Sequence, residues 1–173
     1  MSIAVGITMT AALLAVGAGL AKLASPSTAV EAMRSARLPS CVALVRVGSL
    51  AEASLGVAVL AVGSSLASAA LGAAYVGFAV FSVVAIRTGR ATPCGCFGAG
   101  ASIIGWRHVA TNLVLAAGLG ATAAGGGRSA VTLVRVSPSL GVAATAVAVV
   151  AALLAATFLA GPIASARAET ADA

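Results

Sequence analysis

The sequence predicts an all-α protein: a polytopic transmembrane helical bundle with a four-helix core and a fifth C-terminal span. Composition is the first reason for this fold class, because hydrophobic residues make up 61% of the 173 residues and charged residues only 8%. A soluble domain usually carries about 25% charged residues, so these few charges cannot cover a water-soluble surface. A chain this apolar cannot remain solvated in a disordered state, so intrinsic disorder is excluded as well. An ordinary soluble catalytic domain is therefore excluded.

Five apolar runs are the second reason, since a helix needs about 20 apolar residues to cross a bilayer core of about 30 Å. In chain order the runs cover residues 3–23, 41–62, 66–86, 108–124 and 140–159. The first run follows no basic segment and is too long for a secretory signal, so we interpret it as a span. With 20 glycines and 3% aromatic residues, the helices are expected to pack through small side chains.

Polar connections between the runs complete the domain organisation. Pro26 and Pro39 bound a charged segment at the membrane interface, where a short surface helix can form, and the Gly-Ser-Ser sequence at residues 63–65 predicts a tight turn. We therefore predict a four-helix membrane domain, a polar connection, a fifth transmembrane helix and a polar tail, which cover residues 1–125, 126–139, 140–161 and 162–173 in this order.

The basic residues indicate how the chain is inserted. A net charge of +6 would suggest nucleic acid for a soluble protein, but here topology and lipid headgroups explain it better. We expect a multi-pass protein of the cell membrane with lipid, and no nucleic acid, as a partner. Five crossings place seven basic residues on the face opposite the N-terminus: Lys22, Arg34, Arg37, Arg87, Arg90, Arg107 and Arg167. The N-terminal face holds only Arg128 and Arg135, so the positive-inside rule predicts that the seven-residue face is cytoplasmic.

All three cysteines fall on that same face. Cys41 begins the second run, while Cys94 and Cys96 lie in a loop that Pro93 and Gly98 keep from being a regular helix. A disulfide across one intervening residue closes a small strained ring, and such a bond gives up its oxidising equivalents easily. The pair is therefore predicted to be a redox pair, with Cys41 as a third thiol that resolves or relays. A plain structural loop is the simpler alternative, and a buried structural role is common for a cysteine such as Cys41.

A metal site is the rival chemical interpretation of the same residues. Cys94, Cys96, Cys41 and His108 could supply four soft ligands on one face. The one-residue spacing differs from the two-to-four-residue spacing of most zinc sites, and the chain has a single His. We therefore predict no metal ligand.

Glu52 is a candidate site residue because it lies about 16 Å deep in the second span, where an unpaired ionisable group costs a few kcal/mol. Arg46, six residues earlier on the helix, faces another direction, so Glu52 needs a partner from another helix. Arg46 and Asn112 reach similar depths and predict a polar cluster under the cysteine loop. There Arg46 would stabilise a thiolate or a reduced quinone oxygen, and Glu52 would carry protons. A structural clamp between the second and fourth spans is the alternative.

Aromatic residues give two further expectations. Tyr75 and Phe78 are three apart on one face of the third span and could flank a quinone ring, although core packing is the simpler account. With Arg46 and Asn112, Tyr75 therefore completes the set of predicted quinone contacts. Trp106 most simply anchors the fourth span in the membrane interface.

Several of these residues form a pattern that resembles the MauE family of methylamine-utilisation membrane proteins, which are related to DoxX-like redox membrane proteins. The pattern comprises the Pro-Cys-Gly-Cys-Phe-Gly string at residues 93–98, Trp-Arg-His-Val at residues 106–109, Asn112, and Arg46, Gly48 and Glu52 in an Arg-x-Gly-x-x-x-Glu arrangement. The resemblance covers roughly residues 1–125. Thr111 departs from it, since the family often has a basic residue there.

The resemblance implies a polytopic protein that assists disulfide formation in an exported partner. The family's namesake is needed for maturation of the small, disulfide-rich subunit of methylamine dehydrogenase, often alongside a thioredoxin-like MauD protein. The expected partner is therefore a MauD-type protein or a disulfide-containing client. Disulfides form outside the cytoplasm, whereas the charge count places the cysteines inside, so these two expectations oppose each other.

The resulting hypothesis is a membrane thiol–disulfide redox protein, MauE-like, that assists maturation of a partner. Its predicted catalytic residues are Cys94, Cys96, Cys41, Glu52 and Arg46, and a quinone is its possible cofactor. Two alternatives are a non-catalytic membrane scaffold or chaperone and a thiolate metal-handling protein.

Overall fold

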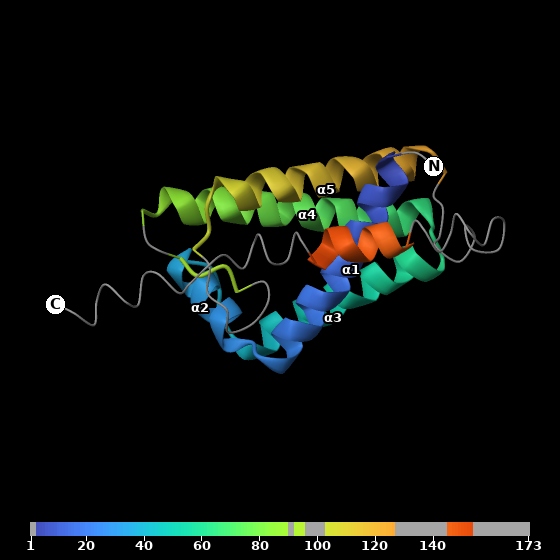
Figure 1. Ribbon diagram of the computed structural model, residues 1–173. Coiled ribbons are helices and arrows are strands. Elements are labelled where there is room, and N and C mark those ends of the chain that lie inside the picture. Colours follow the sequence, from blue (N-terminus) through green and yellow to red (C-terminus); the bar gives the residue numbers. More distant parts are fainter. Residues whose placement is uncertain (1–2, 90–91, 96–102, 127–144, 154–173) are drawn as a thin grey trace.

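A computed structural model describes residues 3–89, 92–95, 103–126 and 145–153 of the chain (Figure 1). Its helices are α1 (Ile3–Ala24), α2 (Ser27–Ser35), α3 (Val42–Ala61), α4 (Ser65–Arg87) and α5 (Trp106–Ala124). A further helical segment covers residues 145–153. The predicted fold class, an all-α helical bundle, is confirmed.

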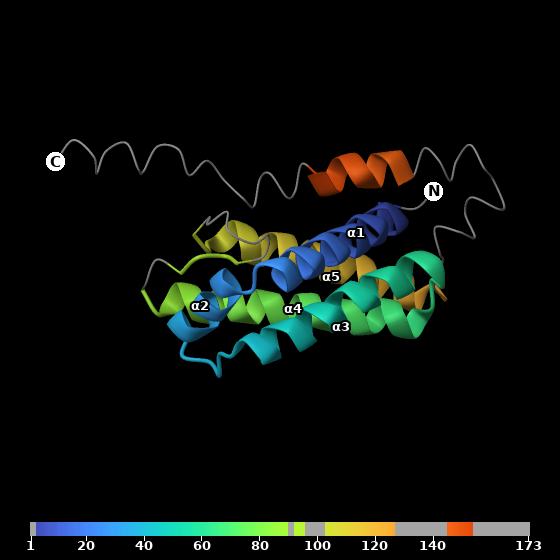
Figure 2. The same cartoon turned by 90° about the horizontal axis from the view of Figure 1, so that it is seen from below.

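The four long helices form the bundle. Successive long helices run in alternating directions, with α1 packed against α3 and α5, and α4 packed against α5 and α3 (Figures 1 and 2). The short helix α2 lies at the end of the bundle where α1 ends and α3 begins, and it contacts α3. This end also holds the end of α4 and the start of α5. The connection from α1 to α3, which contains α2, and the connection from α4 to α5 therefore start and end at the same end of the bundle.

Three of the described helices, α1, α3 and α4, are long and apolar enough to cross a membrane. Helix α5 has 19 residues and packs along α4, but Arg107, His108 and Asn112 in its first two turns make it less apolar. The predicted fourth span therefore corresponds to a helix of the right length with a polar start. For the predicted fifth span, residues 145–153 are helical, and the rest of it lies outside the described residues.

Local sequence signals explain where the helices begin and turn. The hydroxyl of Ser64 accepts a hydrogen bond of 3.0 Å from the N–H of Ala67 and so caps α4. Gly63 before it has a φ of 65°, a conformation that glycine adopts without strain. The predicted tight turn is thus confirmed. The polar segment between the prolines does contain a short helix, α2, which buries Val30 and Ala32.

Small residues let α1 and α3 approach closely, as the composition predicted. A Cβ atom on Gly19 would lie 2.7 Å from the carbonyl oxygen of Ser49, and one on Gly56 would lie 2.7 Å from that of Ala12. Between α1 and α5, the hydroxyl of Thr8 contacts the carbonyl oxygen of Gly118 at 3.1 Å. Backbone contact and buried hydroxyl bonds therefore hold these helices together, as expected for packing in lipid.

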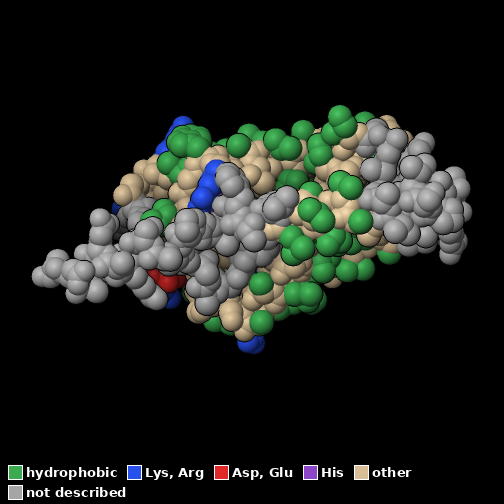
Figure 3. Space-filling view, viewed as in Figure 1, with side chains coloured by type: hydrophobic (Ala, Val, Ile, Leu, Met, Phe, Trp, Pro, Cys, Tyr) green, Lys and Arg blue, Asp and Glu red, His purple; other side chains and the backbone are tan. Residues whose placement is uncertain are grey.

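Large apolar side chains cover much of the outside of the bundle. Val47, Leu50, Val57, Val76, Val80, Leu113 and Val114 are all exposed. Figure 3 shows hydrophobic side chains spread over the face of the bundle seen in Figure 1, with Lys and Arg side chains gathered toward the end that holds α2. Such an apolar exterior suits contact with lipid chains, whereas the basic residues suit the headgroup region.

Candidate functional site

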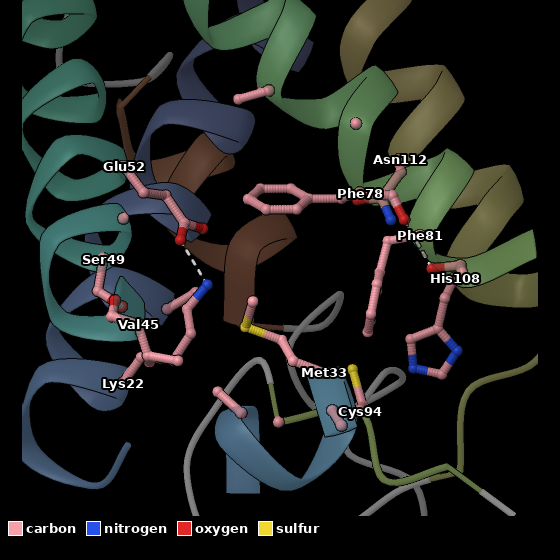
Figure 4. Close-up of a pocket in the computed structure, with 18 of the residues that line it drawn as sticks. Lys22, Met33, Val45, Ser49, Glu52, Phe78, Phe81, Cys94, His108 and Asn112 are labelled. Atoms are coloured by element: carbon pink, nitrogen blue, oxygen red, sulfur yellow. Dashed lines mark hydrogen bonds and ion pairs between the residues drawn. The ribbon is translucent and has the colours of Figure 1, made fainter. Parts of the chain in front are cut away.

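A cavity of about 490 Å³ lies inside the bundle near the end that holds α2 (Figure 4). All five helices and the loop between α4 and α5 contribute to its wall. Most of the lining is apolar, and the polar or charged residues in it are Lys22, Ser49, Glu52, Tyr75, Ser82, Cys94, His108 and Asn112. Its size and its apolar wall with few polar groups are typical of small-molecule sites.

Glu52 and Lys22 form an ion pair in the cavity wall. The Nζ of Lys22, in the last turn of α1, donates a hydrogen bond to Oε2 of Glu52 on α3. Glu52 is only 7% exposed. The ammonium group also lies 5.2 Å from the centroid of the Phe78 ring, within reach of a cation–π interaction. The prediction that Glu52 needs a partner from another helix is confirmed.

Helix register explains why Lys22 is this partner. Gly19 packs against Ser49 and Ala53 of α3, and Lys22 lies nearly one turn further along α1. Because a helical side chain points back toward the N-terminus of its helix, the head of Lys22 reaches Glu52, which lies between Ser49 and Ala53. The aliphatic stem of Lys22 can lie along apolar surface while its head stays at the polar group. The sequence placed Lys22 only among the basic residues at the end of the first span. The sequence carries no signal for this pairing, because it does not show that Gly19 faces α3.

Tyr75 and Phe78 line the cavity from α4. Their rings meet edge to face, with centroids 5.9 Å apart and an interplanar angle of 90°, so the prediction that they share one helix face is confirmed. The hydroxyl of Tyr75 donates a hydrogen bond of 2.7 Å to the carbonyl oxygen of Ala11 on α1. Tyr75 is therefore part of the core and of the cavity wall at the same time. Phe81 adds a third ring to the same lining.

The backbone holds Cys94 against the cavity. Pro93 pairs with Ile103 in an isolated antiparallel bridge, and the N–H of Ile104 donates to the carbonyl oxygen of Thr92 at 2.9 Å. These contacts bring the two ends of the loop together. Cys94 is half-buried and lines the cavity.

Gly95, next to Cys94, allows the loop to lie directly on α2. Its φ is 62°, and a Cβ atom there would lie 2.9 Å from the Cα of Ala29. A side chain at this position would therefore strain the backbone and also collide with α2. Close contact with α2 thus explains why a glycine stands between the two cysteines.

His108 lines the cavity from the first turn of α5. Its Nδ1 accepts a hydrogen bond of 3.1 Å from the N–H of Gly105, the residue that caps α5. His108 is 3% exposed, and its Nε2 is buried without a hydrogen-bond partner in the described part of the chain. Asn112, one turn further along α5, lines the same cavity. Figure 4 shows His108 and Cys94 on the same side of the cavity, opposite Lys22 and Glu52.

The other predicted site residues lie elsewhere. Arg46 is exposed and is not part of the cavity wall, so the structure brings Glu52 and Asn112 to one cavity without Arg46. Cys41 is exposed at the start of α3, where its Sγ accepts a hydrogen bond of 3.4 Å from the N–H of Leu44. Cys96 lies outside the described residues. Among the described residues, no group of three or more His, Cys, Asp or Glu side chains could hold a metal ion.

Comparison with known protein families gives one match. Residues 1–126 match the family described as methylamine utilisation protein MauE. No curated protein and no solved structure matches the chain. The matched segment is more than half of the 173 residues and contains α1 to α5 together with the described residues of the cavity wall. With three helices able to cross a bilayer among the described residues, this is a membrane protein, and it belongs to the MauE family of methylamine utilisation proteins.

Proposed function

We propose that this protein is a multi-pass thiol–disulfide redox protein of the cell membrane that assists disulfide formation, and so maturation, of a partner protein. The supporting observation is the position of Cys94. Its side chain lines a mostly apolar cavity, and the loop that carries it rests on α2 through Gly95. A thiol held at a ligand-sized cavity is better suited to reaction than to filling space.

The chemistry we propose is thiol–disulfide exchange. A thiolate of the reduced partner attacks a disulfide of this protein, and a mixed disulfide between the two proteins forms. A second thiolate of the partner then attacks the mixed disulfide, which leaves the partner oxidised and this protein in its dithiol form. Two electrons pass from the partner to this protein, and one disulfide forms as the other breaks. Cys94 and Cys96 are the pair that we assign to this cycle from their spacing, and Cys41 is the candidate relay thiol. Glu52 is a candidate for carrying the protons that the exchange sets free.

The partner we propose is a thioredoxin-like, MauD-type protein or a disulfide-containing client, as the family suggests. Its docking place would be the end of the bundle that holds α2. Cys41 is exposed there, and the loop with Cys94 starts from the same end. A partner at this end would therefore meet Cys41 and the loop that carries Cys94.

Differential alkylation tests the redox step. Membranes are treated with a thiol reagent before and after a reductant, and the labelling of Cys94 is measured by mass spectrometry. We expect labelling of Cys94 to increase after reduction in the wild type. Unchanged labelling of both Cys94 and Cys96 under all conditions would refute the proposal.

A variant with both Cys94→Ser and Cys96→Ser separates this function from the alternatives. We expect it to lose maturation of the partner although the protein still inserts in the membrane. A scaffold without catalytic thiols would keep partner maturation in this variant. A metal-handling protein would instead carry stoichiometric metal after anaerobic purification and lose it in the same variant.

A further inference from the structure

The bond between His108 and Gly105 fixes which nitrogen of the imidazole carries the proton. Because Nδ1 accepts from the N–H of Gly105 at 3.1 Å, Nδ1 holds no proton, and the proton of the neutral ring is on Nε2. Nε2 is therefore a hydrogen-bond donor. It is buried and has no partner among the residues that the structure describes, and a buried unsatisfied donor is costly enough to call for an explanation.

The surroundings of this donor describe the missing acceptor. His108 is a wall residue of the cavity, and Figure 4 shows its ring on the same side as Cys94. Asn112 follows one turn later on α5 and adds an amide to the same wall. An acceptor held by His108 and Asn112 would thus lie beside the thiol-bearing loop.

The charge of the cavity favours a neutral acceptor over an anion. Lys22 is the one Lys or Arg among the described wall residues, and it is already paired with Glu52. A carboxylate or phosphate headgroup would therefore find no free cation there. Most of the remaining wall is apolar and includes the rings of Tyr75, Phe78 and Phe81, which suit a flat ring of similar kind.

We propose that this cavity binds the ring of a lipophilic quinone, with a quinone carbonyl oxygen accepting a hydrogen bond from Nε2 of His108. The inference rests on the proposed function, because a quinone is useful here as the electron acceptor of the thiols. Oxidation of two thiols to a disulfide releases two electrons and two protons. Reduction of a quinone to a hydroquinone takes up the same number, so the step balances. The alkyl tail would leave the cavity toward the lipid-facing surface.

The quinone contacts in this cavity differ from those that the sequence predicted. Of the residues that the sequence indicated, Asn112 and Tyr75 line the cavity, whereas Arg46 does not. His108 takes the place of Arg46 as the group that binds a quinone oxygen, and it does so as a neutral donor. His108 acts here as a binding residue, since its partner is the acceptor molecule.

The test is binding of decylubiquinone to the purified full-length protein in lipid nanodiscs. Affinity is obtained from the rise in unfolding temperature with ligand concentration. Decylbenzene, which has the same tail and a ring without carbonyl oxygens, is the control ligand. We expect saturable stabilisation by the quinone and none by decylbenzene at matched concentration. Equal stabilisation by both ligands would overturn the proposal and indicate a cavity for any hydrocarbon chain.

Three variants locate the site. His108→Phe keeps a ring of similar size and removes the donor, so we expect the quinone to bind about tenfold more weakly. Asn112→Leu leaves the cap of α5 intact and should weaken binding several-fold, which keeps the test valid if His108→Phe fails to fold. Ser68→Ala is the matched control, because Ser68 carries another buried unpartnered atom but lies outside the cavity wall. Unchanged affinity in both His108→Phe and Asn112→Leu would refute the site.

The same experiments distinguish this inference from the proposed function. If Cys94 changes its redox state in membranes while the purified protein shows no quinone binding, the inference fails and the proposed function stands. If the quinone binds and His108→Phe weakens it while no cysteine ever changes state, the proposed function fails and the binding site stands.

Discussion

The ion pair between Lys22 and Glu52 joins α1 and α3 through two buried charges. Both side chains are largely buried, at 13% and 8% exposure, so removing one partner leaves an uncompensated charge in an apolar wall. We predict that Lys22→Met or Glu52→Gln alone lowers the free energy of unfolding by about 3–5 kcal/mol. Denaturant unfolding of the purified protein in detergent measures this effect.

A double-mutant cycle provides the control for this pair. The variant with both substitutions should be more stable than the sum of the two single effects predicts, because it contains no unpaired charge. Arg46→Met removes an exposed charge from the same helix and should change stability by at most about 0.5 kcal/mol. Strict additivity of the two pair substitutions would show that Lys22 and Glu52 do not interact.

The residue scale also shows what the sequence could and could not reveal about the site. An acidic residue in the middle of an apolar span needs a partner, so the sequence alone predicted that Glu52 has one. The identity of the partner was not, because it depends on how α1 and α3 are placed side by side through Gly19. The sequence indicated a chemical role for His108 only as a possible metal ligand, besides its place in the Trp-Arg-His-Val string. Its unpartnered nitrogen becomes visible once the fold is known.

At the scale of elements, the close approach of α1 and α3 depends on single glycines. A Cβ atom on Gly56 would lie 2.7 Å from the carbonyl oxygen of Ala12 and 2.8 Å from Cγ2 of Val16. We predict that Gly56→Ala lowers the free energy of unfolding by about 1–3 kcal/mol, because the two helices must separate. Gly17→Ala, in α1, has no atom within 4 Å of the new Cβ and should be neutral or stabilising by up to about 1 kcal/mol. Equal stability of the two variants would rule out this packing.

The loop that carries Cys94 gives a second prediction at this scale. Gly95→Ala would strain the backbone and bring a Cβ atom 2.9 Å from Ala29 of α2, so the loop must move away from α2. We predict faster alkylation of Cys94 in this variant than in the wild type. Gly89→Ala is the control, since Gly89 has a similar φ of 67° but no atom within 4 Å of an added Cβ. A similar rate in Gly95→Ala and wild type would mean that contact with α2 does not limit access to Cys94.

Elements were more predictable than their contacts. The length and apolarity of the runs predicted α1, α3 and α4, and proline and glycine positions predicted the turn at Gly63 and the short helix α2. High glycine content predicted close packing, but the sequence did not show which glycines face a neighbour. Gly17 and Gly19 stand two positions apart on α1, yet only Gly19 meets another helix. That difference comes from helix rotation, which is set by the whole bundle.

At the scale of the whole molecule, the alternating helix directions bring α2, the ends of α1 and α4, and the starts of α3 and α5 to one end of the bundle. Arg34 and Arg37 lie in α2 and directly after it, and the ends of α1, α4 and α5 that meet there carry Lys22, Arg87 and Arg107. The predicted grouping of Cys41 with the Cys94 loop rests on the same arrangement, because α3 starts where the loop after α4 lies. The count of crossings was therefore enough to predict the shared end without any side-chain contact.

The last prediction tests this arrangement across the bilayer. Cys41 and Val62 lie at opposite ends of α3, and both are exposed; about 20 helical residues separate them by about 30 Å, the thickness of a bilayer core. Two variants are compared, one with Cys41 as its sole cysteine and one in which Val62→Cys is the sole cysteine. We predict that an impermeant thiol reagent labels each from one side only and that the two sides are opposite.

Intact cells and inside-out vesicles together provide the measurement. Labelling of both positions from the same side would contradict a membrane-crossing α3. The side of Cys41 then decides between the two opposed expectations for the thiols. Labelling from the cytoplasm agrees with the positive-inside rule and makes this end the place where electrons enter or leave. Labelling from outside shows that the rule fails for this chain, and it allows the Cys94 loop to act directly on an exported partner.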